Sequence, residues 1–248
     1  SLFIERNKAL VFGEIFGSTL VPDQRFKSFA LFTGPTNSGN TRAMAALSAL
    51  HDDNSTSSVE LQDLAEDRFA ASNLVREGGR MVNIGTDISS KKVTETGLIK
   101  QLTSDHDESS VQAKHQTRFD VDLPTSQVYN TNEAFLMPSS NGAIPVRLKH
   151  LHFDFQFQSG DEYDADNPRH KEADPHIVSK LTTQERLNAI LLEALDGLRR
   201  LYENDRKYSY NRTEDERWEE YISMADTVGY FLADGNENDF DARDVHNG

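Results

Sequence analysis

Hydrophobic residues recur along the chain in two spacings, one typical of helices and one typical of buried strands. Residues 6–20 carry an apolar stripe at helical spacing and are predicted to form a helix. Residues 25–33 form an apolar run of strand length, and the turn-forming residues 34–39 end it. Residues 41–50 are rich in Ala and Leu, which favours a helix. This part of the chain therefore predicts helix, strand, glycine-containing loop and helix, in that order.

The middle of the chain predicts more strands, with helices between them. The pattern indicates helices over 59–69 and 92–103, a hairpin over 110–122, and strands over 80–85, 126–130 and 144–157. Residues 144–157 are assigned to a strand because Val146, Leu148, Leu151, Phe153, Phe155 and Phe157 alternate with polar residues. Strands that alternate with helices predict an α/β fold, whose sheet is flanked by helices.

The C-terminal third predicts a different organisation. Residues 159–174 are acidic and lack periodicity, which indicates a linker or mobile loop. Two helices follow, each opened by a predicted capping box, at 182–185 and at 213–216. We therefore expect a small C-terminal helical lobe. The predicted division is an N-terminal helical lead-in over 1–24, a core over 25–158, an acidic linker over 159–180 and the helical lobe over 181–248.

Composition narrows the possible classes of protein. Hydrophobic residues make up 36% of the chain and charged residues 27%, which is enough apolar material for a buried core. The absence of cysteine excludes a disulfide scaffold, a zinc–thiolate site and thiol catalysis. No apolar run reaches the roughly 20 residues that span a bilayer, and the first residues lack the pattern of a signal peptide. We expect a soluble, cytoplasmic protein without a membrane partner, and the start at Ser1 indicates a piece of a longer chain.

The net charge of −15 is unevenly distributed. Residues 159–248 hold 22 of the 41 acidic residues and 11 of the 26 basic ones. A salt-adapted source and an ordinary acidic domain explain this balance equally well. Because phosphate attraction needs a basic surface, any binding of nucleic acid must come from a local cluster of positive charge.

The glycine loop is the clearest candidate for chemistry. Its residues are Gly34, Pro35, Thr36, Asn37, Ser38, Gly39, Asn40 and Thr41. Two glycines at this spacing, after a strand and before a helix, let backbone N–H groups converge on phosphate oxygens. The hydroxyl of Thr41 is placed to reach Mg²⁺. However, Asn40 occupies the lysine position of the phosphate-loop pattern, and a neutral amide in place of a charged donor costs roughly 1.5–3 kcal/mol.

Further motifs follow the loop in an order that resembles the superfamily 3 helicase domain of phage, plasmid and poxvirus primase-helicases. The match covers most of the chain. Its motifs are Phe12-Gly13-Glu14, the glycine loop, Met81-Val82-Asn83-Ile84-Gly85-Thr86-Asp87, the stretch 96–105, Tyr129-Asn130-Thr131-Asn132-Glu133 and Pro145-Val146-Arg147. The resemblance implies a P-loop NTPase core of the AAA+-like type that binds ATP and Mg²⁺.

The resemblance also implies roles for single residues. Asp87 resembles the acid that holds Mg²⁺ and polarises the attacking water, or else caps a helix. Asn132 resembles the sensor asparagine, or else is a turn residue. Arg147 resembles an arginine finger supplied to a neighbouring subunit, or else forms an ordinary salt bridge. Lys114 and His115 lie where the family carries a hairpin that contacts single-stranded DNA, or else form an exposed tip.

These implications lead to two functional hypotheses. The first is an ATP-dependent DNA helicase, the motor of a replicative primase-helicase in a prokaryotic, viral or plasmid replication context. By the resemblance, it forms a homo-oligomeric ring that is expected to be hexameric. The resemblance leaves open a primase module upstream in the same chain. The second is a degenerate, non-hydrolysing member that binds DNA or partner subunits, which the Asn40 substitution favours. An unrelated acidic interaction domain is a third alternative.

Overall fold

A computed structural model describes residues 2–66, 74, 80–86, 103, 109–111, 119–121, 125–132, 135, 137 and 143–225 of the chain. Its helices are α1 (Leu2–Ser18), α2 (Asn40–Ser48), α3 (Leu61–Glu66), α5 (Ala143–Arg147), α6 (Ile177–Leu181), α7 (Gln184–Glu203) and α8 (Glu214–Ala225), with short 3₁₀ turns η1 (Gln24–Phe26) and η3 (Gly160–Glu162). Its strands are β1 (Phe29–Thr33), β2 (Thr56–Ser57), β3 (Val82–Gly85), β4 (Ser109–Val111), β5 (Phe119–Val121), β6 (Ser126–Thr131), β7 (Leu148–His152), β8 (Gln156–Gln158) and β9 (His170–Glu172).

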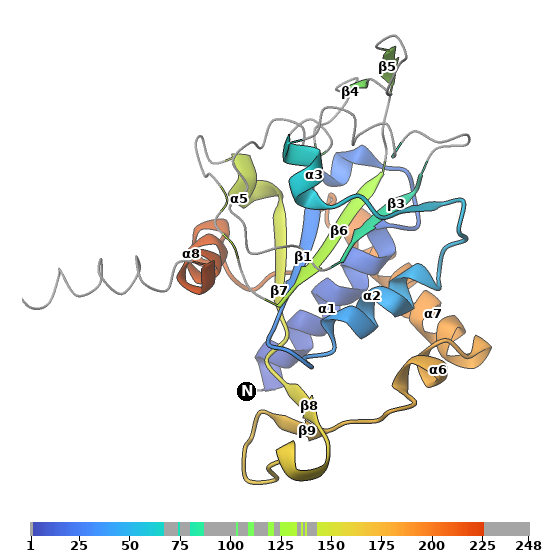
Figure 1. The fold of residues 1–248 in the computed structure, drawn as a ribbon. Helices are drawn as coiled ribbons and strands as arrows, with labels where there is room; N and C mark the ends of the chain where they lie inside the picture. Colours follow the sequence, from blue (N-terminus) through green and yellow to red (C-terminus); the bar gives the residue numbers. More distant parts are fainter. Residues whose placement is uncertain are drawn as a thin grey trace, which may run out of the picture.

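A five-stranded parallel sheet in the order β2-β3-β6-β1-β7 forms the centre of the fold (Figure 1). Every residue of β1 is buried, as expected for a strand with neighbours on both sides and helices on both faces. The glycine loop follows the carboxyl end of β1 and leads into α2. The chain is therefore an α/β protein with a P-loop NTPase-like core, which confirms the predicted fold class.

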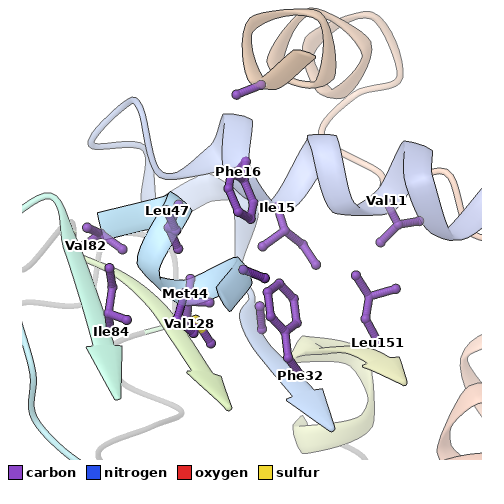
Figure 2. Close-up of a cluster of buried hydrophobic side chains, with 13 residues drawn as sticks. Val11, Ile15, Phe16, Phe32, Met44, Leu47, Val82, Ile84, Val128 and Leu151 are labelled. Atoms are coloured by element: carbon purple, nitrogen blue, oxygen red, sulfur yellow. The ribbon is translucent and has the colours of Figure 1, made fainter. Parts of the chain in front are cut away.

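Alternate residues of β1 pack on opposite faces of the sheet. Ala30 and Phe32 join a cluster built from α1, α2 and α7 (Figure 2), whose buried members include Val11, Ile15, Phe16, Met44, Leu47 and Ala194. Phe29 and Leu31 join a second cluster with α3, α5 and α8, whose members include Leu61, Leu64, Ile144 and Tyr221. The two C-terminal helices thus lie on opposite faces, α7 beside α1 and α8 beside α5.

Most predicted elements that fall on the described residues are confirmed near their predicted positions, and the predicted hairpin is the antiparallel pair β4–β5. The helix predicted over 92–103 lies, except for residue 103, outside the described residues. The strand predicted over 144–157 is wrong. Residues 143–147 form α5, where Pro145 sits in the first turn and needs no hydrogen-bond donor. Only residues 148–152 join the main sheet, while β8 pairs with β9 outside it.

The C-terminal caps differ in detail from the prediction. Thr213 and Glu216 form the predicted capping box, in which each side chain accepts a hydrogen bond from the other residue's N–H group. At α7, Thr183 rather than Thr182 is the N-cap, and its hydroxyl accepts from the N–H of Arg186. Residues 159–180 contain η3, β9 and α6. The boundaries of the predicted domains stay predictions.

The contact between α1 and α7 depends on glycine. A Cβ atom on Gly17 would lie 2.3 Å from the carbonyl oxygen of Ala194, and one on Gly197 would lie 2.2 Å from that of Gly13. Both obstacles are backbone atoms, so they cannot move aside without shifting a helix. The two helix axes therefore approach as closely as their backbones allow.

We predict that Gly17→Ala lowers the free energy of unfolding by about 1–3 kcal/mol, because overpacking outweighs the better helix propensity of Ala. Gly13→Ala is the matched control on the same helix. The nearest atoms there are the movable ends of Arg200 and Glu193 at 3.2 Å and the carbonyl oxygen of Glu193 at 3.3 Å, all farther than the 2.3 Å at Gly17, so we expect a smaller loss. Urea unfolding of the three proteins measures the difference, and a Gly17→Ala protein as stable as wild type would contradict the prediction.

Candidate nucleotide-binding site

The glycine loop adopts a conformation that only some residues tolerate. Asn37 and Gly39 have φ of 64° and 90°, in the left-handed region. At Gly34, a Cβ atom would lie 2.6 Å from the hydroxyl oxygen of Ser38. The N–H of Ser38 donates to the carbonyl of Pro35, 3.0 Å away. The loop is therefore tightly closed on itself between its two glycines.

Several polar groups of the loop are available for a ligand. Among the described residues, the N–H groups of Thr36, Asn37 and Gly39 donate to no other atom. The Ser38 hydroxyl and the Asn130 Oδ1 atom are buried and have no hydrogen-bond partner within the described part of the chain. Buried polar atoms without partners are uncommon in folded proteins and call for an explanation. A bound phosphate group, which accepts from N–H and hydroxyl donors, would supply the missing partner for these donors.

The side chain of Asn40 is used inside the protein. Only 3% of Asn40 is exposed. Its Nδ2 atom donates to the carbonyl of Thr131, 3.1 Å away, and its Oδ1 accepts from the N–H of Thr41 at 2.6 Å. Asn40 thus links the first turn of α2 to the end of β6. It brings no positive charge to the loop.

Thr41, the predicted Mg²⁺ ligand, is exposed on the first turn of α2. Its hydroxyl donates to Asn40 Oδ1 at 3.3 Å and accepts from Asn130 Nδ2 at 3.2 Å. These contacts hold the hydroxyl at the edge of the sheet where β1 and β6 end. A lone pair of the same oxygen could coordinate a cation, because the hydroxyl has two acceptor positions.

A segment beyond the main sheet holds the other side of the loop. The N–H of Phe157 on β8 donates to the carbonyl of Asn37 at 2.9 Å, and the Gln156 amide donates to the carbonyl of Thr36 at 3.3 Å. The Phe157 ring lies 3.4 Å from where a Cβ of Gly39 would be. No local sequence pattern links Gln156 and Phe157 to residues so far away in the chain, so neither was predicted to belong to the site.

The sheet brings some of the predicted site residues together and separates others. Thr33 and Thr131 are register partners, so Asn132, which is exposed, follows β6 beside the start of the glycine loop. Arg147 precedes Leu148, the register partner of Phe29 at the opposite end of β1. Four strand steps of about 3.3 Å separate Phe29 from Thr33, so Arg147 lies more than about 13 Å along the strand direction from the loop. Asp87, Lys114 and His115 lie outside the described residues.

Two histidines of β7 support the residue before the loop. His150 Nε2 and His152 Nδ1 lie 2.7 and 2.9 Å from the hydroxyl oxygen of Thr33. His150 is buried, and burial, reinforced by the positive charges of neighbours that include His152, lowers its pKa to about 3. His150 is therefore neutral at pH 7. The three side chains fix the end of β1.

No cluster of three or more His, Asp or Glu residues with metal-binding geometry occurs in the described ranges, which exclude Asp87. Within those ranges, none of the helices has both the length and the apolar character needed to cross a membrane.

We predict that His150 makes the protein sensitive to acid. Because its pKa is lower in the folded protein than its usual 6.5, the unfolded chain takes up the proton first as pH falls. Stability is therefore lost below about pH 6.5, and this residue contributes about 2 kcal/mol of the loss between pH 7 and pH 5. Urea unfolding at both pH values should show a smaller loss for His150→Gln, which keeps all other titrating groups. Equal losses in the two proteins would refute the assignment.

Similarity to known proteins was found only among solved structures. No family model and no curated protein matches the chain. Two apo structures of the NrS-1 C-terminal region match 93% of the chain at 11% and 13% identity, with TM-scores of 0.49 and 0.47. A structure of JCV helicase matches 78% of it at 17% identity, with a TM-score of 0.33. The chain spans about half the length of these structures, 47% for the first two and 54% for the third. With TM-scores below 0.5, the fold assignment rests on the sheet order and the glycine loop.

Proposed function

We propose that the chain is the ATPase motor domain of a DNA helicase. The observation that carries the proposal is the glycine loop, which joins a buried central strand to α2 and has three N–H groups without partners among the described residues. Such a loop suits the phosphate groups of a nucleotide, because N–H donors and the helix dipole favour negative charge.

The proposed roles of the site residues follow from their positions. The loop N–H groups would bind the phosphates of ATP, and the Thr41 hydroxyl would hold Mg²⁺. Asp87 is proposed as a second oxygen ligand of the cation, and Asn132 as the side chain that orients the attacking water. Magnesium bound here would neutralise charge that develops on the phosphate oxygens.

The position of Arg147 supports an assembly of several copies. Arg147 and the glycine loop lie at opposite ends of β1, so Arg147 does not reach the loop of its own chain. A residue that assists hydrolysis from this position would act on the loop of a neighbouring copy. A head-to-tail contact of this kind closes into a ring if the rotation allows. We propose a homo-oligomeric ring, hexameric by family resemblance, that contacts single-stranded DNA through Lys114 and His115.

A second function is favoured by one specific observation. The buried amide of Asn40 is bonded to Thr131 and Thr41, and the loop lacks the charged donor that a lysine would provide. A loop built in this way suits a domain that binds nucleotide without hydrolysing it and acts by binding DNA or partner subunits. The two functions differ in turnover rather than in fold.

Restoring the lysine separates the two functions. For a motor, we expect wild-type ATPase activity that single-stranded DNA stimulates, and Asn40→Lys should change it less than tenfold. For a non-hydrolysing domain, activity should appear or rise by about ten- to a hundredfold with the lysine, which is the worth of one charge-assisted hydrogen bond. Asn40→Met, similar in length to lysine but uncharged, controls for the lost contacts of Asn40. If equilibrium dialysis detects no uptake of Mg-ATP by the folded protein, both functions are excluded.

Mixing two inactive variants tests the role of Arg147. Thr41→Ala and Arg147→Ala should each abolish hydrolysis in homogeneous rings. In mixed rings of equal proportions, roughly a quarter of the interfaces should combine an intact loop with an intact arginine, because each interface takes one element from each neighbour. Partial recovery of ATPase activity is therefore expected. If both variants assemble and no mixing ratio restores activity, Arg147 does not act between subunits.

A further inference from the structure

A cavity of about 570 Å³ lies at the end of the sheet opposite the glycine loop. Its walls come from four segments: the residues before β1, the junction of α5 with β7, the turn after α7, and the start of α8. Seven lining residues are basic and two, Asp205 and Glu214, are acidic. The basic residues are Arg25, Lys27, Lys149, Arg206, Lys207, Arg212 and Arg217. Such a concentration of positive charge is unexpected in a chain with a net charge of −15.

Neighbouring carboxylates neutralise only part of this charge. Asp23 pairs with Arg25 at 2.8 Å and with Arg206 at 3.3 Å, and Glu220 pairs with Arg212 at 2.7 Å. Among the described residues, no carboxylate forms an ion pair with Lys149, Lys207 or Arg217. Counting Asp23 and Glu220 with the lining residues leaves seven positive groups and four negative ones. The cavity therefore keeps an excess of positive charge.

Lys149 shows how this excess affects the protein. Only 8% of Lys149 is exposed, and its ammonium group donates to the carbonyl of Val146 at 2.6 Å. Burial lowers its pKa to about 8, and the charges of Arg217 and Arg147 act in the same direction, against the opposing charge of Glu214. A buried ammonium group beside a guanidinium group is unfavourable unless an anion offsets the two charges.

Arg217 and two tyrosines give the cavity a fixed shape. The Arg217 guanidinium lies 4.1 Å from the centre of the Tyr210 ring, and its Nε is buried without a hydrogen-bond partner in the described part of the chain. The hydroxyl groups of Tyr208 and Tyr210 are bonded to Ser28 and to the carbonyl of His150. The two rings are thus held in place, and the Arg217 guanidinium is packed on the fixed ring of Tyr210.

The backbone around the cavity is also unusual. Lys27, Asp205 and Arg206 have φ of 47°, 50° and 60°, and they are three of the four non-glycine residues with positive φ in the described ranges. All three line the cavity. Left-handed backbone at such residues is unfavourable and concentrates at ligand sites, where the surrounding structure maintains it.

We propose that this cavity is a second phosphate-binding site, distinct from the glycine loop, for a ligand that carries two or more adjacent phosphate groups. Several fixed cations around one cavity match the closely spaced charges of such a ligand. Free polyphosphate and the backbone of a single-stranded nucleic acid share this chemistry. The site does not depend on the proposed function, because it shares no residue with the glycine loop.

Calorimetry with inorganic tripolyphosphate at low salt tests the proposal on the whole chain. Lys207 is exposed and makes no ion pair among the described residues, so Lys207→Glu should leave the fold intact. We expect this variant to bind tripolyphosphate about tenfold or more weakly, the effect of losing a charged hydrogen-bond donor. Lys180→Glu, an equal change of net charge on α6, should bind as wild type does. Titration near pH 9 in two buffers should also show proton uptake, because a bound anion raises the pKa of Lys149.

The outcomes separate a specific site from general attraction. Equal weakening in Lys207→Glu and Lys180→Glu would show attraction by net charge only and overturn the proposal. Undetectable binding to the wild-type protein at low salt would also overturn it, as would binding by Lys207→Glu that is as tight as that of wild type. If a short DNA strand of mixed sequence displaces tripolyphosphate, the proposal is supported and the phosphate groups that the site binds are those of a nucleic acid. If the strand does not displace tripolyphosphate, the proposal is supported and the ligand is a small polyphosphate.

Discussion

Parallel pairing of β1 with β6 and β7 determines which side chains of this protein can meet. Because all three strands run in one direction, their carboxyl ends share an edge of the sheet, and their amino ends share the other. The glycine loop and Asn132 therefore lie at one edge, while Arg147 lies at the other. Reversing any one strand would exchange these neighbours, so the chemistry at each edge depends on strand direction more than on any single contact.

The two edges also differ in the charge of the groups that face a ligand. At the glycine loop, the donors are backbone N–H groups and hydroxyls, and Asn40 contributes an uncharged amide that is bonded to β6. At the opposite edge, lysines and arginines surround a cavity. Backbone donors suit a ligand whose charge a metal ion partly neutralises, whereas fixed cations suit a ligand that arrives with its full negative charge. The two edges are therefore chemically complementary rather than redundant.

Local sequence patterns predicted the parts of the fold that depend on local interactions. Consecutive residues determine the strand Phe29–Thr33, the following turn and α2. The capping box of Thr213 and Glu216 depends on only four consecutive residues. The prediction for residues 144–157 was wrong at their start, because two local signals compete there. Alternation through Val146 and Leu148 is compatible with a strand, whereas Pro145 suits the first turn of a helix.

Contacts between distant residues were beyond sequence reasoning. The hydrogen bond from Phe157 to Asn37 joins segments that no periodicity relates. The basic cavity is assembled from four segments between residues 25 and 217, and the large negative net charge concealed it. Asn40 was recognised as a missing lysine, but its bond to Thr131 could be seen only once β6 was placed beside β1.

The attachment of β8 to the glycine loop has a mechanical consequence. Because Phe157 and Gln156 are bonded to the carbonyl groups of Asn37 and Thr36, the loop cannot change shape without pulling on the β8–β9 ribbon or breaking those bonds. A movement of the loop that keeps these hydrogen bonds would therefore also move a surface ribbon outside the central sheet. That ribbon is a place where another molecule could sense the state of the loop without touching it.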